Sequence, residues 1–209
     1  MRIAFCSIDA LRQGLDQFQP THVLSIWTPR KPAYRLDGFA QRHFCFHDVE
    51  LWSRETARLR FVTDELVREI VEIEEQAPER FLIHCTAGLS RSPAFAIVAA
   101  IAAGRDVTAT CEEVRRLVPH AQPNRRILAL ADGIMDSALL DAAQATFHYD
   151  RGDGLPQGDR AGLCELFAEQ ANPKRASEGA GEAASATHQV SEFYQSAPAG
   201  SARAAWGHR

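Results

Sequence analysis

The sequence lacks any long apolar run. Residues 1–6 are too few and too soon polar to form a signal peptide, and no later stretch approaches the length of a membrane span. We therefore expect a soluble protein. Basic residues are not in excess either, since the net charge is −4. A chain with this charge is not predicted to bind nucleic acid or an anionic membrane surface.

Cysteine is scarce and scattered. The chain has 5 cysteines among 209 residues, an odd number without the spacings of a disulfide framework or a metal site. The lysine-bearing Walker pattern of nucleotide kinases is also missing. These absences predict a reduced protein of the cytoplasm that requires no metal ion or other cofactor.

Aliphatic residues become rare towards the C-terminus. Residues 146–209 are rich in alanine, glycine, serine and charged side chains and show no sustained hydrophobic period. Such a segment cannot bury enough apolar surface to offset the entropy lost on ordering. We predict one folded domain over residues 1–145 and a low-complexity, mostly disordered tail over residues 146–209, in which residues 161–170 could form a short helix.

Residues 1–145 alternate short apolar runs with amphipathic segments. This alternation predicts an α/β fold, in which a small, mostly parallel central sheet of about four strands is flanked by helices on both faces. The expected strands cover residues 2–6, 22–27, 42–50 and 81–85, and the expected helices cover residues 8–18, 56–76, 93–103, 106–118 and 124–143.

The most informative stretch is residues 81–93, which read FLIHCTAGLSRSP. An apolar run typical of a buried strand leads through a loop of small residues into a nearly all-apolar helix. The backbone N–H groups of such a loop point to one place, and the positive end of the helix dipole faces the same place. An anion is therefore predicted to bind there.

Two side chains give this loop a chemical role. Cys85 opens the loop, and a thiol at a helix N-terminus near a guanidinium is expected to be a thiolate at neutral pH. Arg91 follows six positions later, and its planar donors match two oxygens of a tetrahedral oxyanion. Gly88 suits a turn with positive φ, and Ser92 is placed to hydrogen-bond to the sulfur. The predicted ligand is a phosphate with a nucleophilic sulfur behind it.

A carboxylate upstream of the loop is the candidate proton donor. The expected strand at residues 42–50 ends in polar residues, and ligands of parallel α/β sheets gather at the carboxyl ends of strands. Asp48 should therefore emerge at the same edge as Cys85. Cleavage of a phosphoester needs a donor to the leaving oxygen, and the same group can later activate water. Four other carboxylates remain alternatives to Asp48: Asp37, Glu50, Glu55 and Asp64.

These residues resemble a known family. His84-Cys85, five residues and then Arg91-Ser92 match every defined position of the signature of the cysteine-dependent protein tyrosine phosphatases. The run Ser90-Arg91-Ser92-Pro93 is similar to the dual-specificity branch. The resemblance covers roughly residues 1–145 and implies the phosphatase fold. It also implies an upstream acid, as expected for Asp48.

The resemblance further assigns roles around the signature loop, which we define as residues 85–91. It implies that the side chain of Asn124 braces this loop, although on sequence alone Asn124 is an ordinary helix N-cap. His84 is a supporting residue on the same grounds. The residues implied to bind the phosphate are Thr86, Ala87, Gly88, Leu89, Ser90 and Arg91.

The activity that the resemblance implies is hydrolysis of phosphate monoesters through a phosphocysteine. Cys85 would attack phosphorus, Arg91 and the loop N–H groups would hold the equatorial oxygens, and Asp48 would protonate the leaving oxygen. Ser92 would ease departure of the sulfur in the second step. The loop interior carries no lysine or further arginine, so a phosphoprotein or phosphopeptide is expected rather than a phosphoinositide. Phosphotyrosine is the expected target, with phosphoserine and phosphothreonine as further ones.

Three other activities stay open from the sequence. A rhodanese-like sulfurtransferase also uses a loop cysteine after a strand, but it needs no upstream acid. A non-catalytic phosphate-binding module would keep the loop without turnover, although both Cys85 and Arg91 are present. An arsenate reductase uses a similar loop, usually with further cysteines nearby.

Overall fold

A five-stranded sheet forms the centre of the computed structural model, which describes residues 1–30, 35–73, 78–149 and 159–166. The strand order is β3-β2-β4-β1-β5. The first four strands are mutually parallel, and β5 runs antiparallel to β1. The predicted α/β fold with a mostly parallel sheet is therefore confirmed. The strands are β1 (Arg2–Ser7), β2 (His22–Trp27), β3 (Ala40–Cys45), β4 (Arg80–Cys85) and β5 (Cys164–Leu166).

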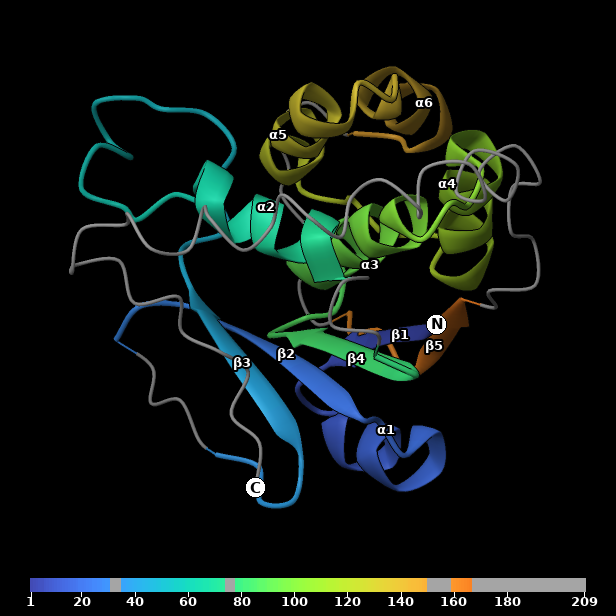
Figure 1. Cartoon of the computed structure of the whole chain (residues 1–209). Helices are drawn as coiled ribbons and strands as arrows, with labels where there is room; N and C mark the ends of the chain where they lie inside the picture. The colour runs from blue at the N-terminus through green and yellow to red at the C-terminus, as the bar shows by residue number, and fades with distance from the viewer. Residues whose placement is uncertain (31–34, 74–77, 150–158, 167–209) are drawn as a thin grey trace, which may run out of the picture.

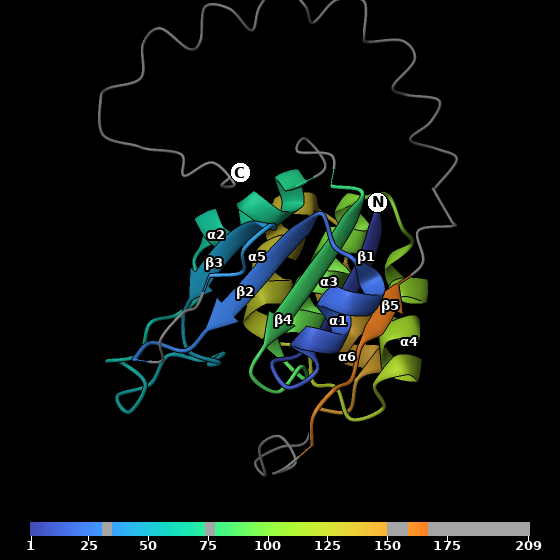
Figure 2. The same cartoon turned by 90° about the horizontal axis from the view of Figure 1, so that it is seen from below.

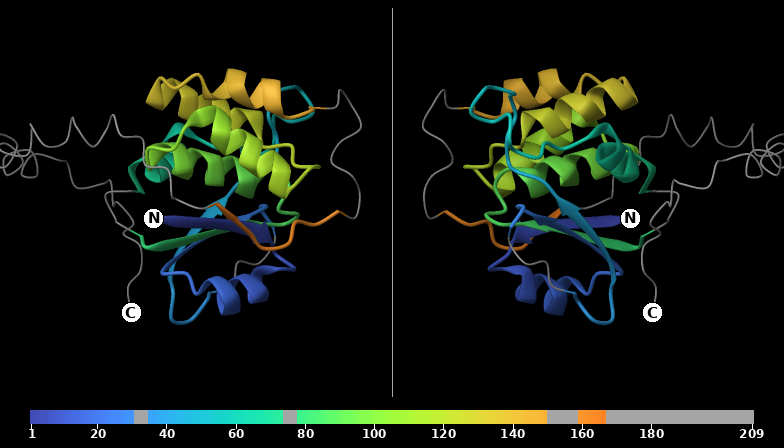
Figure 3. Two further views of the ribbon diagram at one scale, coloured as in Figure 1. Left: turned by 90° about the vertical axis from the view of Figure 1, so that its right-hand side faces the viewer. Right: turned by 90° about the vertical axis from the view of Figure 1, so that its left-hand side faces the viewer.

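Helices lie on both sides of the sheet (Figures 1 and 3). Helix α1 covers one face, where Leu11 and Phe18 pack against Val23 and Leu82 of the strands. The other helices lie on the opposite side. Among them α3 is the innermost, because all 12 of its residues are buried. The helices are α1 (Leu11–Phe18), α2 (Asp64–Val71), α3 (Arg91–Ala102), α4 (Val107–Leu117), α5 (Arg125–Met135) and α6 (Leu139–Thr146).

The expected helix at residues 56–76 exists but starts eight residues later than predicted. Helix α2 begins at Asp64, and residues 54–58 form turns. Two hydroxyl groups explain the difference, because Thr56 Oγ1 accepts from Ser53 N at 2.7 Å and Ser53 Oγ accepts from Thr56 N at 3.2 Å. Such side-chain bonds offer the backbone an alternative to the helix. Residues 74–76 of the prediction lie outside the described residues.

The expected helix at residues 124–143 is two helices, α5 and α6. The chain turns between them, where Asp136 and Ala138 adopt positive φ angles of 51°. The carboxylate of Asp132 accepts from the N–H groups of Leu139 at 2.9 Å and Leu140 at 3.3 Å. These bonds satisfy donors that every helix leaves unpaired in its first turn, so Asp132 starts a new helix at this point.

The expected helix at residues 161–170 is wrong as far as the structure describes it. Residues 164–166 form β5, in which Cys164 pairs with Phe5 and Leu166 with Ile3. The alternation is that of a strand, because Cys164 and Leu166 are buried while Glu165 forms an ion pair with Arg2 at 2.8 Å. Part of the predicted tail thus completes the sheet. From residue 167 on, the tail lies outside the described residues.

No helix in the described ranges has the length and apolarity needed to cross a membrane.

Candidate active site

The signature loop lies at the carboxyl edge of the parallel strands. Cys85 ends β4, and Ser7 pairs with it at the end of β1. Helix α3 begins at Arg91, so the loop connects the central strand directly to the buried helix (Figure 2). The arrangement is the one predicted from the apolar strand, the small-residue loop and the apolar helix.

The sulfur of Cys85 is buried within this loop. The residue is 2% exposed, and its Sγ accepts a hydrogen bond from the backbone N–H of Gly88 at 3.3 Å. Ser92 Oγ lies 3.2 Å from the same Sγ and 3.4 Å from the carbonyl oxygen of Cys6. Two donors are therefore placed to stabilise negative charge on the sulfur.

Gly88 allows the loop to close around the sulfur. Its φ is +77°, and a Cβ at this position would lie 2.6 Å from Ser7 N and 2.8 Å from Ala161 Cβ. No larger residue fits both the backbone conformation and the space. The sequence predicted the positive φ but not the crowding.

The loop is held from outside by residues 159–166, which we call the C-terminal strap. The N–H of Ala161 donates to the carbonyl of Ala87 at 3.0 Å, and its carbonyl accepts from Ser7 N at 3.1 Å. On the neighbouring turn, Ile8 N donates to the carbonyl of Thr86 at 3.3 Å. The sequence suggested that a segment from residue 161 on could dock on the domain or on a partner, but as a helix, and it gave no sign of the contact with the signature loop.

Arg91 is buried with part of its donor set unused. Its residue is 3% exposed, and Nη1 donates to the Phe46 carbonyl at 3.1 Å and to Thr28 Oγ1 at 3.2 Å. Nη2 donates to Thr86 Oγ1 at 3.3 Å. Among the described residues Nε has no hydrogen-bond partner. A guanidinium has five N–H donors, and three of them are used here, so Nε–H and one N–H of Nη2 have no hydrogen-bond partner among the described residues. Because an unpaired buried donor is costly, these two N–H groups point to a bound oxyanion.

Asp48 lies against the signature loop. Its Oδ1 accepts from Ser90 Oγ and from Asn124 Nδ2, both at 2.8 Å. Its Oδ2 lies 3.6 Å from Arg91 Nε. The side chain is 29% exposed, which leaves it open to water and to a ligand. One carboxylate oxygen is thus fixed, and the other faces the arginine.

Asn124 combines the two roles that the sequence assigned to it separately. Its Oδ1 accepts from Ile127 N at 3.2 Å and so caps α5, while its Nδ2 donates to Asp48. Its backbone N–H donates to the carbonyl of Ser90 at 3.2 Å. The helix cap therefore also connects the acid to the loop.

The alternative carboxylates lie elsewhere. Glu50 accepts from Arg125 N at 2.8 Å and from Arg125 Nε at 2.6 Å, at the start of α5. Glu55 contacts Ser53, Asp64 is in the first turn of α2, and Asp37 is exposed. Within the described ranges, Asp48 is the carboxylate that hydrogen-bonds to the signature loop.

His84 is anchored by residues that sequence reasoning did not select. Its Nε2 lies 2.7 Å from Ser25 Oγ, which accepts from Gln41 Nε2 at 2.8 Å. Burial, with a smaller effect of His43, lowers the pKa of His84 to about 4, so the ring is neutral at physiological pH. Ser25 is the one polar residue among the five buried residues of β2, a signal that could have identified it.

Comparisons with known proteins find related sequences and a related fold. No model of a known protein family matches the chain. The sequence is 29% identical over 130 residues to protein phosphatase Slingshot homolog 3 of Homo sapiens and 30% identical over 117 residues to that of Mus musculus. These matches cover 60% and 56% of this chain but only 19% and 17% of the relatives, so the chain spans less than a fifth of their length.

A solved structure shows the same fold. The crystal structure of DUSP15 superposes with a TM-score of 0.51 at 15% sequence identity, and the match covers 71% of this chain and 94% of that one.

Proposed function

We propose that this chain, whose sequence and fold fit the dual-specificity branch of the cysteine-dependent protein tyrosine phosphatases, hydrolyses phosphate monoesters on proteins. The observation that carries the proposal is the meeting of three groups at one loop. They are the Cys85 sulfur, the unpaired Nε of Arg91 and the carboxylate of Asp48. Ser92 contacts the sulfur, Ser90 and Asn124 hold the carboxylate, and Asp48 Oδ2 lies 3.6 Å from Arg91 Nε.

In the first step the Cys85 thiolate attacks phosphorus in line with the leaving oxygen. The equatorial oxygens bind to the Nε–Nη2 edge of Arg91 and to the loop N–H groups, which stabilise the charge of the transition state. Asp48 protonates the leaving oxygen. Oδ2 is the oxygen suited to carry this proton, because Oδ1 already accepts from Ser90 and Asn124. The product is a phosphocysteine and a free hydroxyl group.

In the second step a water molecule attacks the phosphocysteine. Asp48, now a carboxylate, accepts a proton from this water, and the sulfur leaves as a thiolate. Ser92 Oγ and the N–H of Gly88 stabilise the departing sulfur from their positions at 3.2 Å and 3.3 Å. Inorganic phosphate is released and the free enzyme is restored.

The proposed substrates are phosphoproteins or phosphopeptides, with phosphotyrosine as the first target and phosphoserine and phosphothreonine as further ones. The signature loop contains no basic side chain besides Arg91, so it offers few charges for a multiply phosphorylated inositol. All 5 cysteines are free thiols. Because a cysteine nucleophile needs a reducing environment, we place the protein in the cytoplasm.

Two substitutions test the mechanism. Cys85→Ser should abolish phosphate release from a small aryl phosphate while retaining phosphate binding, measured by calorimetry. Asp48→Ala should lower kcat for the aryl ester by about 10²–10⁴-fold, the usual contribution of a general acid. Asp37→Ala, which removes an exposed carboxylate, is the matched control and should behave as wild type. Undiminished turnover by Cys85→Ser would refute the mechanism.

The same proteins separate the other activities. A sulfurtransferase would consume thiosulfate and would be insensitive to Asp48→Ala, whereas an arsenate reductase would require a thiol reductant in stoichiometric amounts. The placement of Asp48 beside Arg91 favours phosphoester cleavage over sulfur transfer, because sulfur transfer needs no proton donor at this position.

A further inference from the structure

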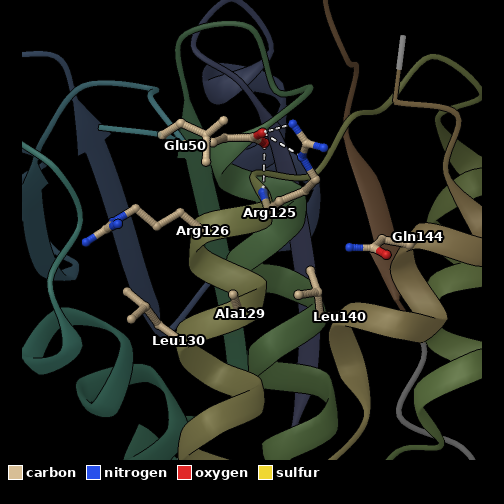
Figure 4. A pocket seen from close by; sticks show the side chains of 8 residues that line it. Glu50, Arg125, Arg126, Ala129, Leu130, Leu140 and Gln144 are labelled. Carbon is tan, nitrogen blue, oxygen red and sulfur yellow. Dashed lines mark hydrogen bonds and ion pairs between the residues drawn. The ribbon is translucent and has the colours of Figure 1, made fainter. Parts of the chain in front are cut away.

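A groove beside the candidate active site has no role in the mechanism described above. It has a volume of about 310 Å³ and lies between α5, α6 and the segment that follows Asp48. Figure 4 shows Ala129 and Leu140 at its centre and the Glu50–Arg125 pair at one end. The lining residues are Glu50, Leu51, Arg125, Arg126, Ala129, Leu130, Leu140 and Gln144.

The groove lies next to the candidate active site. Its lining residue Glu50 binds Arg125, the first residue of α5, and Asp48, two residues before Glu50, binds Asn124, the N-cap of the same helix. A polypeptide whose phosphorylated side chain binds at the signature loop therefore has this groove within a few residues of it.

The floor and one rim of the groove are apolar. Ala129, Leu130 and Leu140 leave part of their surface open, and Leu51 on the rim is 75% exposed. Its neighbour Trp52 is 69% exposed, and these two are the large hydrophobic side chains exposed in the described part of the chain. Exposed apolar groups next to a hollow of this size are typical of a surface that binds a partner.

The charge of the groove selects the kind of partner. The carboxylate of Glu50 is neutralised by Arg125 at 2.6 Å. Arg126 lies over the ring of Phe61 at 5.1 Å and donates to the Val62 carbonyl at 3.4 Å, but no carboxylate of the described residues forms an ion pair with it. Figure 4 shows the Arg126 side chain extending away from Ala129 and Leu140, so its unmatched positive charge lies at the edge of the groove. This arrangement complements an acidic side chain that is close to an apolar one in the partner.

We propose that this groove binds the polypeptide of the phosphoprotein substrate, next to its phosphorylated residue. An apolar side chain of the substrate lies on Ala129 and Leu140, and an acidic side chain near it pairs with Arg126. This inference rests on the proposed function and deepens it, because it assigns the enzyme a polypeptide substrate with a local sequence preference. A small phosphate ester would fill the signature loop and leave the groove empty.

The test compares an aryl phosphate with phosphotyrosyl peptides in which leucine or alanine occupies each position around the phosphotyrosine in turn. For the 209-residue chain, kcat/KM should be about tenfold higher with leucine at one position, the expected gain from burying one such side chain. Ala129→Trp fills the groove and should remove this preference. Ala109→Trp, on the exposed face of α4, is the matched control and should keep it.

A second pair of variants tests whether the positive charge of Arg126 contributes to peptide binding. Arg126→Glu should lower the ratio of peptide to aryl-phosphate kcat/KM by about threefold to tenfold for peptides that carry a glutamate near the leucine. Arg116→Glu, a reversal at an exposed position of α4, should leave the ratio as in wild type.

The outcomes separate the two proposals. If the wild-type protein hydrolyses the aryl phosphate but prefers no side chain at any position, the docking proposal is overturned while the proposed function stands. If no phosphate ester is hydrolysed, both are overturned. If sedimentation shows a dimer that Ala129→Trp dissociates, while peptide preference is unchanged, a second copy of this chain occupies the groove and the docking proposal is again overturned.

Discussion

Substitution of Gly88 by alanine tests whether the signature loop is under two independent constraints. The first is conformational, because φ is +77° at this residue. The second is steric, because the added Cβ would lie 2.6 Å from Ser7 N, 2.8 Å from Ala161 Cβ and 2.9 Å from Cys6 C. Two of these three atoms belong to backbone, which cannot rotate out of the way as a flexible side chain can.

The expected cost follows from adding the two constraints. A non-glycine residue in the left-handed region costs about 1–2 kcal/mol. Overpacking of a close-packed region costs about 1–3 kcal/mol more. We therefore expect Gly88→Ala to lower the free energy of unfolding by about 2–5 kcal/mol. In the molecules that stay folded, the shifted N–H of residue 88 should no longer reach the Cys85 sulfur, so kcat should fall about tenfold or more.

Two other glycines provide matched controls. Gly38 has a φ of +85° but open space around its Cβ position, so Gly38→Ala should show the conformational cost alone, about 1–2 kcal/mol. Gly133 lies in α5 with no atom near its Cβ position, so Gly133→Ala should raise stability by about 0.5–1 kcal/mol. Urea unfolding and aryl-phosphate kinetics measure both effects. A Gly88→Ala protein within about 0.5 kcal/mol of wild type would refute the reasoning.

Two further predictions concern groups behind the loop. His84 has a pKa lowered from 6.5 to about 4, so the unfolded chain takes up its proton first as pH falls. The contribution of neutral His84 to stability is complete above pH 6.5 and is lost as the pH falls towards 4. The free energy of unfolding should therefore drop by about 2 kcal/mol between pH 7 and pH 5 because of this residue. In His84→Gln this drop, measured by urea unfolding at the two pH values, should be smaller by the same amount. Ala161→Pro removes the N–H that donates to Ala87 O and should lower kcat about tenfold. Ala161→Gly keeps this N–H and should leave kcat unchanged. Equal kcat values for the two variants would contradict a positioning role of the C-terminal strap.

The sequence predicted those parts of the molecule whose signal is local. Three of the four parallel strands, β1, β2 and β4, are mostly apolar runs with five buried residues each, and the predicted bounds of β2 agree with the structure. The loop at Cys85 was found because its chemistry needs particular residue types in order along the chain. Asp48 was selected by the general rule that ligands lie at the carboxyl ends of parallel strands, a rule that needs no knowledge of side-chain contacts.

The failures all depend on contacts distant in sequence or on single side chains. The break between α5 and α6 requires the Asp132 carboxylate to turn back to Leu139, and helical periodicity continues across it without interruption. Strand β5 is only 3 residues long and becomes a strand by pairing with β1, so its own residues carry almost no signal. The groove between α5 and α6 could not be predicted from the sequence either, because it forms between two helices that the sequence predicted as one.

The contacts of Asp48 with Ser90 and Asn124 join the proposed acid and the signature loop into one unit. Ser90 is the N-cap residue of α3 and Asn124 that of α5, and both donate to the same oxygen of Asp48. Because α3 is wholly buried and packs against α5, the distance between the acid and the loop is set by the packing of two helices in the core. A substitution in that packing should therefore change catalysis without touching a reacting group, and a loop transplanted without α5 should bind phosphate while transferring protons poorly.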